Sequence, residues 1–178
     1  RLIKGTSEFG KELDSLTDFV SFGIAPVFIL YFWQLNNYGK LGWVITLIYS
    51  VCCALRLARF NLTKTDEKQL WKNNYFEGVP SPAGGILILM PLIFELAELN
   101  FNFNIKNITP FFTIFIAFLL VSKLPTLSLK KISISPKSTV FILLGIGTVI
   151  ISLLFFTFKT LLLFALVYLI SLPVSFFM

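Results

Sequence analysis

The sequence predicts an all-α membrane protein, a polytopic bundle of about six transmembrane helices in a single membrane-embedded domain, residues 1–178. Of the 178 residues, 56% are hydrophobic and only 13% are charged, and the mean hydropathy is +0.84. This composition is too apolar for a soluble globular protein of the same length. The apolar residues also form runs close to the roughly 17–25 residues that a transmembrane helix needs. These runs are continuous and lack the alternation of a membrane strand, so no sheet is expected.

Six stretches have the length and composition of a membrane span. They cover approximately residues 15–35, 39–58, 82–99, 109–124, 138–157 and 159–177. The chain begins with Arg1 instead of a methionine, and no signal-peptide pattern precedes the first span. We therefore expect a further N-terminal helix before Arg1.

The first span opens with two acidic residues. Gly10, Asp14 and Asp18 follow one another at intervals of four residues, so they share one helix face with about 6 Å between successive positions. Both carboxylates can then reach one ion, and the glycine leaves room beside them. Such a pair suits a hard divalent cation bound to phosphate. The alternative is that the acids cap the helix or form ion pairs with Arg56 or Arg59.

The second span ends with Arg56, Arg59 and Asn61. The two arginines are three residues apart on one helix face, and guanidinium groups bind carboxylates and phosphates well. Membrane orientation and the helix dipole also place arginines at the inner end of a span without any ligand. Both interpretations stay open from these residues alone.

A loop rich in glycine and proline, 76–85, leads into the third span. Gly78 and Pro80 are expected to form a tight turn, and Ser81 to cap a helix that has Pro82 in its first position. Read alone, this is a structural loop that re-enters the membrane. Beyond it, residues 123–137 are expected to be a solvated connector, and the last two spans to be scaffold.

Alternating spans divide the basic residues unequally between the two sides of the membrane. Only Lys40, Lys106 and Lys159 lie on one side. The other twelve are Arg1, Lys4, Lys11, Arg56, Arg59, Lys64, Lys68, Lys72, Lys123, Lys130, Lys131 and Lys137. The positive-inside rule makes the richer side cytoplasmic. Seven of the nine acidic residues lie there too, so polar chemistry is expected at the cytoplasmic surface.

Several classes of function are excluded or disfavoured by composition. The chain has no histidine, which excludes an imidazole base and a Ser-His-Asp triad within it. Cys52 and Cys53 are adjacent, so they cannot form an ordinary disulfide and do not match a zinc spacing. The net charge of +6 fits attraction to anionic lipid, and without a nucleic-acid module no nucleic-acid partner is expected.

The spacing Arg1-x8-Gly10-x3-Asp14-x3-Asp18 resembles the second half of the CDP-alcohol phosphatidyltransferase signature, D-x2-D-G-x2-A-R-x8-G-x3-D-x3-D. Within that superfamily, three segments look like the phosphatidylserine synthase branch. They are Ser21-Phe-Gly-Ile-Ala-Pro26, Leu55-Arg-Leu-Ala-Arg-Phe-Asn61 and Phe76-Glu-Gly-Val-Pro-Ser-Pro-Ala-Gly-Gly85. The first half of the signature would precede Arg1. Without it the binuclear site is incomplete, so residues 1–178 alone are expected to be inactive.

The resemblance implies transfer of a phosphatidyl group from CDP-diacylglycerol to L-serine, with release of CMP. It implies a catalytic half at 1–100, a scaffold at 101–178 and two divalent cations, Mg²⁺ or Mn²⁺. Asp14 and Asp18 would bind metal, and Asp18 would also deprotonate the acceptor hydroxyl. Arg1 and Gly10 would bind the nucleotide.

The acceptor site and the setting of the enzyme follow from the same resemblance. An arginine of the segment with Arg56, Arg59 and Asn61 would hold the serine carboxylate or a phosphate. The family resemblance also implies a homodimer, with Gly84, Gly85, Gly145 and Gly147 allowing close helix contacts. The expected location is the plasma or inner membrane of a bacterium or archaeon, with the active site facing the cytoplasm.

Three alternatives remain at this point. The acceptor could be another alcohol, such as glycerol 3-phosphate or inositol phosphate. The lipid donor could be of the archaeal type. In a different class, a cation transporter would place ionisable residues through the depth of the bilayer, whereas the middle of nearly every span here is apolar.

Overall fold

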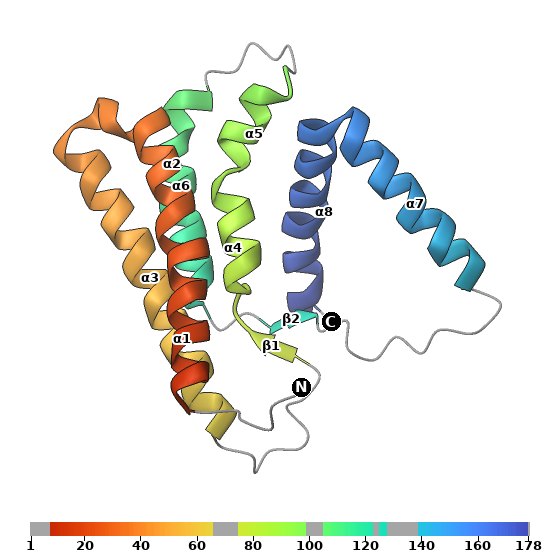
Figure 1. Ribbon diagram of the computed structural model, residues 1–178. Helices are drawn as coiled ribbons and strands as arrows, with labels where there is room; N and C mark the ends of the chain where they lie inside the picture. The colour runs from red at the N-terminus through yellow and green to blue at the C-terminus, as the bar shows by residue number, and fades with distance from the viewer. Residues whose placement is uncertain (1–7, 66–74, 99–104, 123–124, 128–138, 178) are drawn as a thin grey trace.

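The computed structural model describes residues 8–65, 75–98, 105–122, 125–127 and 139–177 as a helical bundle with one short strand pair at one end (Figure 1). The elements in chain order are α1 (Glu8–Asp18), η1 (Phe19–Ile24), α2 (Ala25–Trp33), η2 (Leu35–Tyr38), α3 (Lys40–Thr65), β1 (Tyr75–Glu77), α4 (Ser81–Ile88), α5 (Met90–Leu96), α6 (Ile105–Val121), β2 (Pro125–Leu127), α7 (Thr139–Phe155) and α8 (Thr157–Phe177). The all-α prediction is confirmed for the bulk of the chain.

The first predicted span is one helical rod made of α1, the π-helical η1 and α2. A tight reversal through the 3-10 segment η2 returns the chain into α3. Gly39 adopts a positive φ of 55°, and a Cβ built at Gly42 would lie 1.9 Å from the carbonyl oxygen of Leu35. Only glycine allows this close approach of backbone to backbone. The reversal therefore sets α3 directly alongside α2.

The third predicted span, 82–99, is two helices instead of one. α4 ends at Ile88 and α5 begins at Met90, with Leu89 between them. Pro91 has no N–H, and its ring clashes with the carbonyl group of Leu87 in a continuous helix. The break at Leu89 is the physical result, and α5 continues roughly in the direction of α4 (Figure 1).

A proline inside α6 also removes a backbone hydrogen bond, but it does not break the helix. Pro110 cannot donate to the carbonyl group of Lys106, and the helix continues through it. The hydroxyl of Tyr38, from η2, donates to that same Lys106 oxygen at 3.4 Å. The orphaned acceptor thus helps to fasten η2 to the start of α6.

The expectation that the chain contains no sheet is wrong at one place. β1 and β2 pair antiparallel, with Tyr75 opposite Leu127 and Glu77 opposite Pro125. Three residues of the predicted solvated connector 123–137 therefore belong to a strand. Extended segments at the same end of the bundle satisfy each other's backbone groups, and Pro125 can join because it is the first residue of its strand.

The core lies where α2, α3, α4 and α6 meet. Its largest fully buried side chains include Tyr49, Leu30, Leu87, Ile116 and Leu120. Small residues bring the helices together: a Cβ built at Gly84 would lie 2.7 Å from a methyl carbon of Leu120. The core thus combines helices of the predicted catalytic half with α6, which lies in the predicted scaffold.

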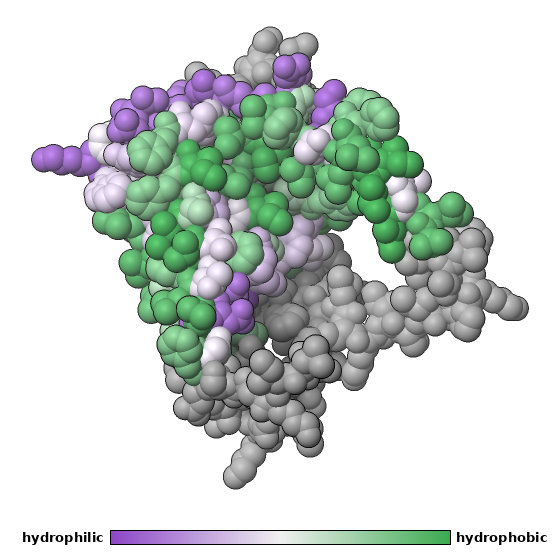
Figure 2. All heavy atoms as spheres, in the orientation of Figure 1, coloured by the Kyte–Doolittle hydropathy of each residue, from purple (hydrophilic) through white to green (hydrophobic). Residues whose placement is uncertain are grey.

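The outward surface of the helices is largely apolar, as expected of an α-helical membrane protein (Figure 2). Two helical stretches are long and apolar enough to cross a membrane, Glu12–Trp33 and Lys40–Asn61. The apolar stretches Ile105–Val121, Leu143–Phe155 and Thr157–Leu172 are shorter. Two of the six predicted spans thus have a counterpart of full crossing length among the described residues. α7 contacts mainly α8 and otherwise stands apart from the bundle (Figure 1).

Candidate functional site

The acidic face predicted at the start of the chain lies on α1. Gly10 and Asp14 are exposed, and Asp18, the last residue of the helix, is partly buried. Neither carboxylate has a hydrogen bond or an ion pair with another described residue. No described side chain therefore occupies either carboxylate, and the ion pairs with Arg56 or Arg59 that were the alternative are absent from the described part of the chain. Arg1 lies outside the described residues.

A π-helical turn follows Asp18 immediately. The N–H of Ala25 bonds to the carbonyl oxygen of Val20, five residues back. Pro26 has no N–H to offer to the carbonyl group of Phe22, and the hydroxyl of Tyr49 donates to that oxygen at 3.1 Å. π-turns inside helices occur frequently at functional sites. Here the turn joins the end of the acidic helix to α3.

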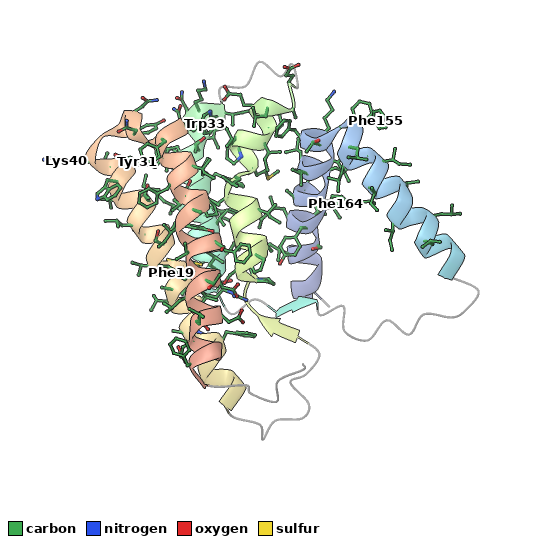
Figure 3. All side chains as sticks on the ribbon, viewed as in Figure 1. Phe19, Tyr31, Trp33, Lys40, Phe155 and Phe164 are labelled. Carbon is green, nitrogen blue, oxygen red and sulfur yellow. The ribbon has the colours of Figure 1, made fainter. Side chains whose placement is uncertain are left out.

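Gly23 allows η1 to pack closely against α3. A Cβ built there would lie 2.9 Å from the Phe19 ring and 3.0 Å from the sulfur of Cys53. Figure 3 shows Phe19 in the half of the bundle nearer the strands, whereas Tyr31 and Lys40 lie at the other end. The packing of η1 on α3 thus fixes the position of the helix that ends with Asp18.

Arg56 of α3 stands at the junction of several elements. Its Nη1 donates to the hydroxyl of Ser81, a fully buried residue at the start of α4. Its guanidinium also lies over the Phe60 ring, 5.8 Å from the ring centre. Arg56 interacts electrostatically with Asp18 and with Tyr168 of α8. The arginine is thus hydrogen-bonded to α4 and lies within electrostatic range of the acidic helix and of α8.

The other two predicted acceptor residues lie close by in sequence and have partners in the bundle. Arg59 donates from Nη1 to the carbonyl oxygen of Val121 at 3.0 Å, at the end of α6. Asn61 donates from Nδ2 to the hydroxyl of Ser15 at 2.8 Å, on α1. These contacts hold α3 against both neighbours at the end of the bundle where Arg56 lies.

The glycine- and proline-rich loop is a turn, as predicted, but Ser81 is not the N-cap of the helix that follows it, α4. Pro80 is the capping residue, with extended backbone angles, and Ser81 is the first residue of α4. The Ser81 hydroxyl is occupied by Arg56 and makes no capping hydrogen bond. Gly78 has a φ of 77°, and a Cβ there would lie 2.7 Å from the carbonyl oxygen of Ser122. Glycine is thus required at this position.

The donor set at Asp14 and Asp18 fits a hard divalent cation. Carboxylate oxygens are the ligands that Mg²⁺ prefers, and neither carboxylate is paired with a described side chain. Within the described ranges, no group of three or more His, Cys, Asp or Glu side chains comes together. Asp14 and Asp18 could therefore supply only part of a coordination shell, and further ligands would be needed to complete it.

Tyr168 of α8 also belongs to this cluster. It lies in the predicted scaffold, because a lone tyrosine in an apolar span carries no sequence pattern. The structure brings it from α8 to Arg56. Cys53 is a free, buried thiol beside Ser81 and Arg56. Neither cysteine forms a disulfide, in agreement with the expectation.

Curated relatives carry a consistent name. A protein of Mycobacterium leprae is 36% identical over 140 residues, which cover 76% of this chain and 45% of the relative. One of Helicobacter pylori is 30% identical over 152 residues, 85% of this chain and 62% of the relative. One of Methanocaldococcus jannaschii is 42% identical over 84 residues, 47% of this chain and 36% of the relative. Each is named CDP-diacylglycerol-serine O-phosphatidyltransferase.

The chain spans about half the length of the mycobacterial relatives that it matches. The family model for CDP-alcohol phosphatidyltransferases matches residues 1–176, which include the acidic face of α1, the arginine segment of α3 and the loop before α4. The resemblance read from the signature spacing is thereby confirmed, and the chain belongs to the CDP-alcohol phosphatidyltransferase family.

Proposed function

We propose that this protein transfers the phosphatidyl group of CDP-diacylglycerol to the hydroxyl of L-serine, giving phosphatidylserine and CMP. The observation that carries the proposal is the relation between Asp18 and Arg56. An available carboxylate ends the acidic helix, and an arginine anchored by Ser81 interacts with it electrostatically. The names of the relatives support serine as the acceptor and CDP-diacylglycerol as the donor.

Asp14 and Asp18 would hold a divalent cation, Mg²⁺ or Mn²⁺, and a second one with further ligands. When bound, such ions stabilise the charge on the pyrophosphate oxygens during displacement of CMP. Asp18, the more shielded of the two acids, would take the proton from the serine hydroxyl. Gly10 and Arg1 would lie along the nucleotide.

Arg56 is our candidate for the residue that binds an anionic group of a substrate. A guanidinium can form two parallel hydrogen bonds to one carboxylate or phosphate. Arg59 and Asn61 would complete the same anion-binding segment of α3, and their contacts with α6 and α1 would hold this segment in place. A bound carboxylate would distinguish serine from uncharged alcohols.

The setting that we propose is a bacterial or archaeal plasma or inner membrane, crossed by about six helices of residues 1–178, with this site facing the cytoplasm. The excess of basic residues on the side that carries Arg56 supports that orientation. We also propose a homodimer. A Cβ built at Gly145 or Gly147 would meet no other described atom within 4 Å, which leaves room for a close helix contact.

The proposed function is tested by supplying membranes that contain the full-length protein with CDP-diacylglycerol and labelled alcohols. Labelled serine is compared with glycerol 3-phosphate and inositol phosphate, and an Asp18→Asn variant is measured in parallel. Incorporation of serine that requires the metal and is lost in the variant supports the proposal. Incorporation of another alcohol would keep the transfer and discard serine. No transfer to any alcohol would contradict the proposed activity.

A further inference from the structure

Two buried polar atoms near the proposed site have no hydrogen-bond partner among the residues that the structure describes. They are Nε of Arg56, on α3, and the hydroxyl oxygen of Tyr168, on α8. Buried polar groups in folded proteins are nearly always satisfied, and each exception calls for an explanation. Two such atoms from separate helices point to one shared cause.

The two side chains are close enough to interact electrostatically. Their surroundings hold both in place: Arg56 is anchored through Nη1 to Ser81 and lies over Phe60. Tyr168 packs against the hydrophobic core, to which α8 also contributes the buried Leu172. The unsatisfied atoms therefore belong to side chains that are packed among their neighbours.

The chemistry of the two atoms defines what would satisfy them. Nε of arginine is a donor only, and a tyrosine hydroxyl donates one hydrogen bond. A group that only accepts hydrogen bonds, and that carries negative charge, would pair with both. Carboxylates and phosphates are such groups, and hydrogen bonds to them are stronger than those between neutral partners.

We propose that Tyr168 and Nε of Arg56 together bind one anionic group of a substrate. The inference rests on the proposed transfer reaction and adds a specificity residue from α8 to it. The carboxylate of the amino-acid acceptor is favoured over a phosphate of the donor by the position of Asp18. Arg56 interacts with both Asp18 and Tyr168, and L-serine carries its hydroxyl and its carboxylate on adjacent carbon atoms. A serine hydroxyl at Asp18 thus brings the carboxylate towards Arg56.

The test uses the full-length protein purified in lipid-detergent micelles, with Tyr168→Phe compared with the wild type. This change removes only the hydroxyl and keeps the ring in its packing. The matched control is Tyr31→Phe, because the Tyr31 hydroxyl bonds to Asn36 at the other end of the bundle (Figure 3). KM and kcat are measured with L-serine, and the dissociation constant is measured separately for CMP.

A carboxylate site predicts that Tyr168→Phe raises KM for L-serine by about ten- to one-hundred-fold, with a smaller effect on kcat and none on CMP binding. A phosphate site predicts weaker CMP binding and an unchanged KM for serine. Arg56→Lys keeps the positive charge and loses Nε. It should therefore change the same constant as Tyr168→Phe does: KM for L-serine at a carboxylate site, or the dissociation constant for CMP at a phosphate site. This second variant carries the test if Tyr168→Phe does not accumulate.

Some outcomes would overturn the inference. It is wrong if Tyr168→Phe matches the wild type in both measurements, or if Tyr31→Phe produces the same change. A wild-type protein that binds CMP but transfers nothing to serine would instead contradict the proposed function. In that case the dissociation constants for CMP of the wild type and the variants alone decide whether Tyr168 and Arg56 bind a phosphate.

Discussion

The guanidinium of Arg56 donates a hydrogen bond to the hydroxyl of Ser81, which is fully buried at the first turn of α4, 25 residues further along the chain. This bond fixes an arginine between the acidic helix and α8. It also explains why a serine follows Pro80 without capping the helix. Ser81, which has the sequence pattern of a helix-capping residue, thus positions the guanidinium of Arg56, a candidate substrate-binding group.

The first prediction concerns Ser81→Ala. Loss of the hydroxyl leaves Nη1 of Arg56 without its acceptor and the side chain free to move. Because hydrogen bonds to charged groups contribute about 1.5–3 kcal/mol, kcat/KM for serine should fall at least about tenfold. The control is Ser50→Ala, whose hydroxyl bonds to the carbonyl oxygen of Thr46 within α3. Equal activities of the two variants would contradict a positioning role for Ser81.

The second prediction concerns the acids of α1. Asp14→Asn should raise the Mg²⁺ or Mn²⁺ concentration needed for half-maximal transfer, because a metal-binding carboxylate becomes a neutral amide. Removal of the metal with a chelator should stop transfer, and added Mg²⁺ or Mn²⁺ should restore it. Glu12→Gln is the matched control, since Glu12 is exposed on the same helix but two residues away from Asp14, on another face. An identical metal requirement in all three proteins would exclude Asp14 as a ligand.

The elements that follow from local patterns were predictable from the sequence. Asp14 and Asp18 share a face because a helix repeats every 3.6 residues, and each of the six apolar runs is mainly helical where described. The break at Leu89 was also predictable from the sequence, since Pro91 lies in the middle of the predicted third span. Periodicity alone does not reveal it, because the run remains apolar on both sides of the proline.

The contacts between distant segments were not predictable. The pairing of Arg56 with Ser81, the approach of Tyr168 from α8 and the β1–β2 strand pair all join residues that are far apart in the sequence. A single sequence carries no signal for such contacts. The π-turn after Asp18 depends likewise on Tyr49 of another helix, which satisfies the oxygen that Pro26 leaves free.

The third prediction concerns the contact of η1 with α3. Gly23→Ala should lower the midpoint of heat inactivation and the transfer activity, because the new methyl group meets the Phe19 ring and Cys53. Adding Cys53→Ala should recover part of the loss, since it removes the sulfur atom of one of the two obstructing side chains. Val20→Ala is the control, since Val20 lies in the same η1 segment with an exposed side chain. Purely additive effects of the two changes would show that the residues are not coupled.

The fourth prediction separates backbone strain from steric clash at Gly78. Gly39 and Gly78 both have positive φ, 55° and 77°, so alanine at either position costs roughly 1–2 kcal/mol in conformation. Only at Gly78 does the new Cβ also meet a backbone atom, the carbonyl oxygen of Ser122 at 2.7 Å, whereas nothing lies within 4 Å at Gly39. Gly78→Ala should therefore lower the heat-inactivation midpoint more than Gly39→Ala does. It should also lower transfer activity, because a displaced loop moves Ser81 and with it the anchor of Arg56. A Gly78→Ala protein as stable and as active as Gly39→Ala would mean that this loop does not position the arginine.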